Sequence, residues 1–291
     1  MDQRNKPPEK DAEMNNIVYL NGRFLNEEDA LISPKDRGFI FADGVYEVVK
    51  YYNGKPFRID DHLQRLKRSL SELDIQYTGV SELEEIFQVL LKQNNLENAH
   101  TGIYVQITRG INKRVHYFPQ NITPTVYAFA FELPSSKENL ENGISVITHP
   151  DIRWQRCDIK SVSLLPNTMM YNKAVQAGAG ECILIRDGIV TEATHSSVLM
   201  IKNGVVITHP LSNHVLPGIT RKVVLEICKE NNIAVEERLV SERELFEMDE
   251  IIIAGTGSEI TPVIQVNDKI INGNLPGKIT RFLQKRFFEK V

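Results

Sequence analysis

The stretch Cys157-Asp158-Ile159-Lys160-Ser161 places a lysine between the apolar residues Ile159 and Val162, which indicates a position on or beside a buried strand. A second stretch, Val190-Thr191-Glu192-Ala193-Thr194, places a glutamate directly after an expected strand. Two segments rich in small residues follow, Leu216-Pro217-Gly218-Ile219-Thr220-Arg221 and Gly255-Thr256-Gly257-Ser258. The chain therefore combines one amine, one carboxylate and two turns that suit an anion.

These are the parts that a pyridoxal phosphate site requires. An amine forms the Schiff base, a carboxylate keeps the pyridine nitrogen protonated, and backbone N–H groups with Thr or Ser hydroxyls hold the phosphate. Each residue also has an ordinary interpretation. Lys160 fits a solvent-facing strand lysine and Glu192 a turn glutamate, and these are the commoner cases. Residues 218–220 fit plain helix capping and residues 256–258 a tight turn equally well, so the combination carries the argument.

A carboxylate clamp is indicated by Arg114-Val115-His116. Side chains two residues apart point the same way in an extended segment, so Arg114 and His116 would face one substrate carboxylate. Tyr46 could add a phenol to the same clamp. A basic surface loop is the commoner explanation of the first pair, and an ordinary half-buried strand residue explains the tyrosine.

The composition argues against several functional classes. The 291 residues carry a net charge of -4, whereas nucleic-acid-binding proteins usually show a basic face. No apolar run approaches the roughly 20 residues that span a bilayer, so we expect no membrane partner. The histidines show no metal-ligand spacing and the three cysteines form no CxxC pair. We therefore expect no metal site, no disulfide and a cytoplasmic location.

Composition and periodicity divide the chain into four expected segments: a disordered tail at 1–14, a small N-terminal α+β domain at 15–133, a polar linker at 134–142 and a larger C-terminal domain at 143–291. Leucines at helical spacing predict a helix at 60–73 in the first domain. In the second domain we expect a helix at 218–231 and an apolar strand at 250–254 that runs directly into the glycine-containing turn.

Together these segments resemble the fold-type IV pyridoxal-phosphate enzymes, the class IV aminotransferases, from about Ile17 to the C-terminus. Besides the lysine stretch, the resemblance is carried by Asp36-Arg37-Gly38-Phe39, Asp43-Gly44-Val45-Tyr46-Glu47-Val48, His62-Leu63-Gln64-Arg65-Leu66, Thr108-Arg109-Gly110, Arg114-Val115-His116, Ile152-Arg153-Trp154, Gly218-Ile219-Thr220-Arg221 and Ser258-Glu259-Ile260-Thr261-Pro262-Val263. Within the family, the Arg-x-His pair is typical of the branch that acts on D-amino acids.

The resemblance implies an α+β fold with a smaller N-terminal α/β domain and a larger C-terminal domain of barrel-like sheets flanked by helices. It implies that Lys160 binds pyridoxal phosphate covalently and moves the proton between Cα and C4′, while Glu192 contacts the pyridine nitrogen. Leu216 would lie against the ring. The residues that would hold the phosphate are Arg65, Ile219, Thr220 and Thr256.

The resemblance further implies a homodimer with its sites at the subunit interface. Tyr46 would bind the substrate carboxylate together with Arg114 and His116 reaching over from the neighbouring subunit. The implied reaction moves an amino group from a D-amino acid such as D-alanine to a 2-oxo acid such as 2-oxoglutarate, by a ping-pong mechanism through pyridoxamine phosphate.

The run after Glu192 departs from the family pattern. Ser197 stands where an asparagine is usual, Leu199 where an aromatic is usual, and His195 where a small residue is common. These changes leave alternatives open. The same fold supports aminodeoxychorismate lyase activity and branched-chain or amine transamination, and a relative that binds the cofactor without catalysis would also keep it.

Overall fold

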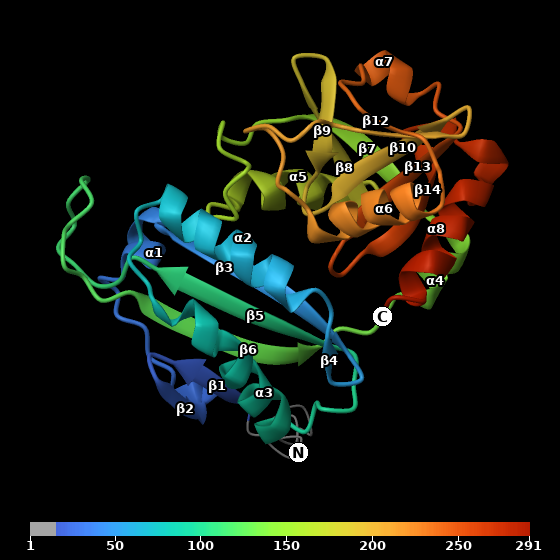
Figure 1. Cartoon of the computed structure of the whole chain (residues 1–291). Coiled ribbons are helices and arrows are strands. Elements are labelled where there is room, and N and C mark those ends of the chain that lie inside the picture. Colours follow the sequence, from blue (N-terminus) through green and yellow to red (C-terminus); the bar gives the residue numbers. More distant parts are fainter. Residues whose placement is uncertain (1–15) are drawn as a thin grey trace, which may run out of the picture.

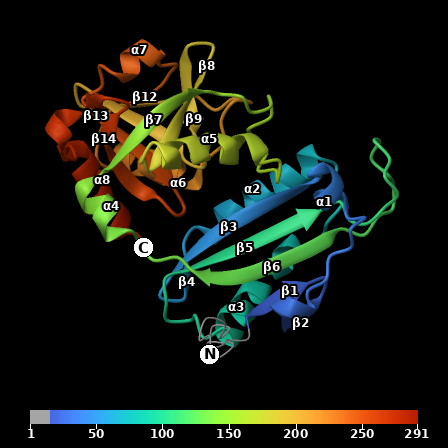
Figure 2. The ribbon, with the colours of Figure 1, turned by 180° about the vertical axis from the view of Figure 1, so that it is seen from behind.

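The computed structural model describes residues 16–291, so the tail expected at 1–14 lies outside the described residues. Within residues 16–291 the strands form two sheets (Figure 1). The first is built from the chain before residue 133 and the second from the chain after residue 143. Figure 2 shows the same division from behind, with the blue-to-green and the green-to-red halves side by side.

The first sheet is antiparallel throughout, in the order β2-β1-β6-β5-β3-β4. Its strands are β1 Ile17–Leu20, β2 Arg23–Asn26, β3 Gly44–Tyr52, β4 Lys55–Pro56, β5 Thr101–Thr108 and β6 Thr125–Glu132. The helices of this half are α1 Arg37–Phe41, α2 Ile59–Glu72 and α3 Leu83–Gln93. Helices α2 and α3 bury their apolar faces against one face of the sheet, where Leu66, Phe87 and Ile103 are fully buried.

The second sheet follows the order β12-β11-β10-β13-β14-β7-β8-β9, with β15 paired to β14. Its strands are β7 Ile144–Pro150, β8 Glu181–Arg186, β9 Ile189–Ala193, β10 Ser197–Lys202, β11 Val205–Thr208, β12 Val235–Glu237, β13 Glu250–Gly255, β14 Glu259–Val266 and β15 Lys269–Ile270. The helices of this half are α4 Lys137–Asn142, α5 Leu165–Gln176, α6 Ile219–Glu230, α7 Glu242–Leu245 and α8 Lys278–Phe288.

The central strands of the second sheet are buried on both faces. One face contributes Ile183, Met200 and Ile251 to a core enclosed by the curled sheet. The opposite face packs under α6 and α8, which bury Val223 and Leu283. Because both faces are covered, these strands are nearly continuous apolar runs rather than alternating ones. The expected α+β fold with two sheet-based halves is confirmed.

Local expectations differ from the structure at the ends of helices, in the linker and at the lysine segment. Lys160 lies outside the strands, and its segment pairs with β3 only through a single bridge between Ser161 and Val45. Helix α2 starts at Ile59 rather than at residue 60, because Arg58 takes up the left-handed conformation that precedes the first turn. The segment expected as a linker at 134–142 contains α4, whose first turn is capped by the Ser136 hydroxyl. The helix expected at 218–231 is α6. No helix in residues 16–291 is long and apolar enough to cross a membrane.

Candidate active site

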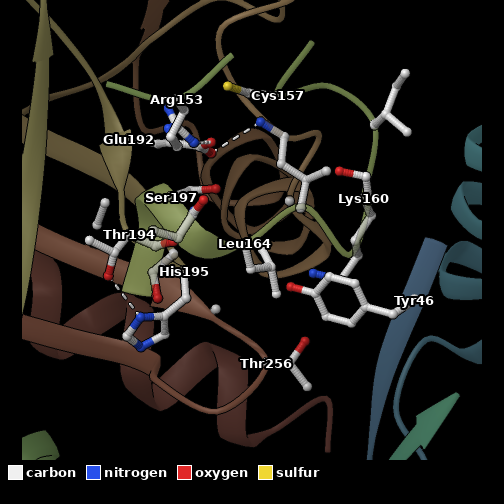
Figure 3. Close-up of a pocket in the computed structure, with 18 of the residues that line it drawn as sticks. Tyr46, Arg153, Cys157, Lys160, Leu164, Glu192, Thr194, His195, Ser197 and Thr256 are labelled. Carbon is white, nitrogen blue, oxygen red and sulfur yellow. Dashed lines mark hydrogen bonds and ion pairs between the residues drawn. The ribbon is translucent and has the colours of Figure 1, made fainter. Parts of the chain in front are cut away.

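A pocket lies where the two halves of the chain meet (Figure 3). Most of the residues predicted from the sequence line it: Tyr46, Arg65, Lys160, Glu192, Leu216, Ile219, Thr220 and Thr256. They come from β3, α2, β9, the start of α6 and the turn after β13, and from the connection before α5. The fold therefore collects into one cavity side chains that are up to 210 residues apart in the sequence.

Lys160 is held against β3 by backbone pairing. The Tyr46 N–H donates to the Lys160 carbonyl over 3.0 Å, and the Val162 N–H donates to the Gly44 carbonyl over 3.0 Å. Strand β4 pairs only with the last residues of β3, and the lysine segment pairs with the first ones on the same edge. The backbone groups there thus have the hydrogen-bond partners that buried groups require. Within the described residues no carboxylate pairs with the Lys160 amine, and its Nζ lies 4.2 Å from the centre of the Tyr46 ring.

Glu192 is buried, and each of its carboxylate oxygens accepts a hydrogen bond. Arg153 donates to its Oε1, and the Leu216 N–H donates to its Oε2 over 3.0 Å. Burial raises the pKa of Glu192, and the attraction of Arg153 opposes that rise without cancelling it. Arg153 is itself fixed by Asp151, which accepts from its Nε and Nη2 over 2.9 and 2.8 Å. The carboxylate therefore has a fixed position in the pocket wall, and its oxygens keep lone pairs that can accept a further hydrogen bond.

Arg65 projects from α2 and forms hydrogen bonds to residues of both halves of the chain. Its Nε and Nη2 donate to the two oxygens of Glu47 over 2.7 and 2.9 Å, and its Nη1 donates to the Pro217 carbonyl over 3.0 Å. His62 also contacts Glu47, over 2.9 Å. Burial by itself would raise the pKa of Glu47, but Arg65 and His62 together hold it well below its ordinary value. The guanidinium is thereby oriented beside the start of α6.

Replacing Glu47 with alanine should destabilise the cofactor-free protein by about 3–5 kcal/mol, because a buried arginine loses its partner. Urea unfolding would measure this loss. The loss should shrink as the pH falls below about 4.5, because a carboxylate with a lowered folded-state pKa contributes stability only while it is ionised. Glu230→Ala, which removes a surface partner of Lys290, is the control and should change stability by less than about 1 kcal/mol. A loss of unfolding free energy in E47A no larger than in the control would contradict the role of Glu47 as the buried partner of Arg65.

The first turn of α6 forms an anion-binding end. Gly218 caps the helix without a side-chain hydrogen bond, and the first turn contains no acidic residue. Among the described residues the N–H groups of Ile219 and Thr220 have no acceptor. A Cβ on Gly218 would lie 2.5 Å from Ser197 Oγ, so a larger residue there would have to displace the Ser197 side chain. Free N–H groups at a helix N-terminus favour an anionic group.

The turn after β13 adds hydroxyl groups to the same end of the pocket. Thr256 follows Gly255 and lines the cavity, and Ser196 lines it as well. Ser196 Oγ and Ser258 Oγ are 2.8 Å apart, which links the turn to the residue just before β10. The two phosphate-compatible segments singled out in the sequence therefore face one cavity.

Arg114 and His116 do not line this pocket. They lie on the connection between β5 and β6, which projects away from the body of the molecule in Figures 1 and 2. Both pack near Phe41, with ring centroids of His116 and Phe41 5.5 Å apart. The arm, residues 109–124, is held at Val115 by buried Arg37, which donates to the Val115 carbonyl and to Asp43.

The three departures from the family pattern have different surroundings. Leu199 is fully buried under α6 and α8, away from the pocket. Ser197 faces Gly218 in the pocket wall. The His195 side chain is 55% exposed at the pocket, and its Nδ1 lies 2.9 Å from buried Glu181 (Figure 3 shows it beside Thr194). The bulk of His195 is thus directed by Glu181 and does not fill the space between Lys160 and Glu192.

Several functional neighbours were not predicted from the sequence. Arg153 and Glu47 stand inside stretches that carry the family resemblance, yet no local pattern indicates that they pair with Glu192 and Arg65. Glu181 carries no sequence signal beyond being a charged residue in an apolar strand. That signal is informative, because a buried charge requires a partner.

The pocket fits pyridoxal phosphate. Lys160 supplies an amine free of any carboxylate partner among the described residues, and Glu192 supplies a fixed buried carboxylate for the ring nitrogen. Leu216 also lines the pocket, and its N–H donates to Glu192. The unpaired N–H groups of Ile219 and Thr220 and the Thr256 hydroxyl suit a phosphate. Each of the three functional groups of the cofactor therefore has a matching element of the chain.

Comparison with curated proteins gives close relatives over nearly the whole chain. Residues 44–266 match the family described as amino-transferase class IV. The chain is 42% identical over 273 residues to D-alanine aminotransferase of Staphylococcus haemolyticus, covering 93% of this chain and 96% of that protein. It is 41% identical over 268 residues to D-alanine aminotransferase of Bacillus licheniformis, covering 92% and 94%.

Solved structures agree with the fold. The branched-chain amino acid aminotransferase of Escherichia coli superposes with a TM-score of 0.87 at 26% identity, covering 94% of both chains. The PLP-form of the branched-chain aminotransferase from Thermobaculum terrenum superposes with a TM-score of 0.84 at 23% identity, again over 94% of both chains, and this likeness concerns the fold alone. Family match, relatives and pocket agree, and the chain belongs to the class IV aminotransferases, which are pyridoxal-phosphate-dependent enzymes.

Proposed function

We propose that this aminotransferase moves the amino group of a D-amino acid, such as D-alanine, to a 2-oxo acid, such as 2-oxoglutarate. The observation that carries the proposal is the convergence of the Lys160 amine and the buried Glu192 carboxylate on one pocket. Relatives named D-alanine aminotransferase, 41% and 42% identical to the chain, support the choice of D-amino acids. Lyase and branched-chain or amine substrates have no comparable support.

The chain supplies binding and proton transfer in this reaction. Bound pyridoxal phosphate supplies the electron sink that stabilises negative charge developing at the substrate Cα. Lys160 Nζ would take the proton from that carbon and later donate it, acting first as base and then as acid. Glu192 holds a proton on the ring nitrogen, and Arg153 keeps that carboxylate in place.

The phosphate end is held by groups that need not move. Arg65, the Ile219 and Thr220 N–H groups and Thr256 line the anion-binding end, and Leu216 would pack along the ring. Prepositioned donors of this kind stabilise an anion without reorganisation. Tight phosphate binding fixes the ring, so that the Lys160 amine stays within reach of the reacting carbon.

The substrate carboxylate is bound by Tyr46 together with Arg114 and His116 of a second subunit. We infer this arrangement from the projecting arm at 109–124, because Arg114 and His116 are too far along it to line the pocket of their own chain. The active protein is then a homodimer. A cytoplasmic location fits the three cysteines, all of them unpaired and buried.

Replacing Arg114 with alanine should weaken binding of amino acids far more than binding of simple amines. A charge-assisted hydrogen bond to a carboxylate contributes about 1.5–3 kcal/mol, so KM for D-alanine should rise at least about tenfold. Steady-state kinetics with D-alanine and with an amine of similar size would measure the difference. Equal losses for both substrates would contradict a carboxylate clamp. Lys113→Ala, which removes a neighbouring positive charge on the same arm, is the matched control.

The proposed reaction is tested by incubating the enzyme with D-alanine and 2-oxoglutarate and separating the products on a chiral column. The proposal predicts pyruvate and D-glutamate in equal amounts, with parallel double-reciprocal plots that indicate a ping-pong mechanism. Pyruvate formed in no more than one equivalent per enzyme, with no glutamate, would contradict transfer of the amino group to 2-oxoglutarate. Formation of L-glutamate from L-alanine at a higher rate would contradict the preference for D-amino acids.

A further inference from the structure

A second buried charge cluster lies between the two halves of the molecule, apart from the pocket residues. Glu259, at the start of β14, accepts three hydrogen bonds on its Oε1. They come from Lys50 Nζ over 2.9 Å, from the Tyr52 hydroxyl over 2.6 Å and from Ser135 Oγ over 2.7 Å. Lys50 and Tyr52 belong to the first sheet and Glu259 to the second. The cluster therefore joins the halves.

The cluster is strongly shielded from water. The side chains of Lys50 and Glu259 are each 1% exposed. Glu259 Oε2 is also buried and has no hydrogen-bond partner among the described residues. Removing two charges from water is unfavourable unless the geometry is good, so an ion pair at this depth is weak support for stability alone. The position of the ion pair, between β3 and β14, is therefore the better guide to its role.

Strand β3 connects the cluster to the pocket. Side chains two apart share a face of a strand, so Tyr46, Lys50 and Tyr52 all face the second half of the chain. Tyr46 meets Lys160 at one end of the strand, while Lys50 and Tyr52 meet Glu259 at the other. One rigid strand thus contacts the second half at two points.

Glu259 in turn ends the hairpin that carries Thr256. It pairs with Gly255 across the hairpin, so that residues 256–258 form the tip. Its backbone has φ of +52°, in the left-handed region that favours glycine and asparagine. A glutamate persists in such a conformation only where its surroundings fix it, and the three donors on its side chain do so. Leu133, close to Ser135 in the chain, also approaches the tip, 3.9 Å from a Cβ position at Gly257.

We propose that Glu259 is a positioning residue, which fixes the Thr256 turn against strand β3 and so sets the phosphate-binding end of the pocket relative to Tyr46. The inference rests on the proposed phosphate role of Thr256. Lys50, Tyr52 and Ser135 hold the side chain, and the left-handed backbone of Glu259 transmits that position to the turn. None of the cluster residues lines the pocket, so the cluster would act on phosphate binding through the turn alone.

The proposal is tested by titrating the cofactor-free protein with pyridoxal phosphate and, separately, with pyridoxal, which lacks the phosphate. Absorbance of the bound vitamin reports both dissociation constants without any measurement of turnover. Glu259→Gln keeps the size of the side chain and removes its charge. It should raise the dissociation constant for pyridoxal phosphate about tenfold, the scale of one charge-assisted hydrogen bond, and leave that for pyridoxal within about twofold.

Tyr52→Phe removes one donor and leaves the ion pair, so it should fold and show the same selective effect at about threefold. If E259Q does not fold, Y52F alone tests the positioning role. Lys290→Met, which breaks an ion pair with Glu230 on the surface, is the control and should change neither constant. Equal weakening of both ligands, or a lower thermal midpoint with both constants unchanged, would overturn the positioning role.

Thr256→Ala separates this inference from the proposed function. If T256A weakens pyridoxal phosphate selectively but E259Q and Y52F do not, the positioning role alone is wrong. If T256A leaves the ratio of the two constants unchanged, the phosphate role of the turn is wrong, and the positioning role falls with it. Selective weakening in all three variants supports both.

Discussion

Replacing Lys160 with alanine should lower kcat at least about a thousandfold, because the same amine is assigned both covalent cofactor binding and proton transfer. No neighbouring group can take over. In the pocket wall the other basic side chains are Arg65 and Arg153, both held by carboxylates, and His195, which faces Glu181. Purified K160A should also lack the absorption band that the bound cofactor gives in the wild type.

Lys173→Ala is the matched control for this substitution. Lys173 is exposed on α5, near the pocket but outside its lining, so its removal should leave both the turnover and the absorption band unchanged. K160A that retains more than about a tenth of wild-type turnover would contradict the role of the lysine, since general acid–base catalysis alone contributes at least about a hundredfold.

Replacing Glu192 with glutamine should lower kcat about a hundredfold or more, because an amide cannot keep a proton on the ring nitrogen, and loss of one prepositioned electrostatic group commonly has this size. The side chain keeps its shape, so cofactor binding should weaken much less than turnover falls. Arg153 would lose its carboxylate partner on Glu192 but keep the two hydrogen bonds to Asp151. The fold should therefore survive.

Glu250→Gln is the control for changing a buried glutamate. Glu250 accepts from the Thr280 N–H over 2.8 Å at the start of α8, far from the pocket lining. E250Q should lower the thermal midpoint and leave kcat unchanged, whereas E192Q should show the opposite pattern. A kcat for E192Q within about tenfold of wild type would show that the carboxylate is not needed at the ring nitrogen.

The sequence predicts the chemical groups of the site better than it predicts their supports. The amine at Lys160, the carboxylate at Glu192 and the free start of α6 all appear as local patterns, because each depends on a short stretch of chain. Arg153 is 39 residues from Glu192, and no local rule joins them. Pairing across such separations depends on which strands become neighbours, and periodicity does not encode that order.

Strand β3 illustrates the same limit. Its Val- and Tyr-rich sequence predicts a strand. Three of its polar side chains, however, contact residues that are distant in the sequence. Glu47 holds Arg65, Lys50 holds Glu259 over 209 residues, and Tyr46 contacts Lys160. Charged residues inside an apolar strand are the one available signal, because burial of a charge requires a partner. That signal indicates that a partner exists without identifying it.

The most direct test of the account is the absorption spectrum of the purified enzyme before and after addition of D-alanine, and separately of L-alanine. The account predicts a visible to near-ultraviolet band of the bound cofactor that shifts to the aminated form with D-alanine and stays unchanged with L-alanine over the same period. A band that shifts with L-alanine alone, or with neither isomer, would contradict D-amino acid transamination by this site.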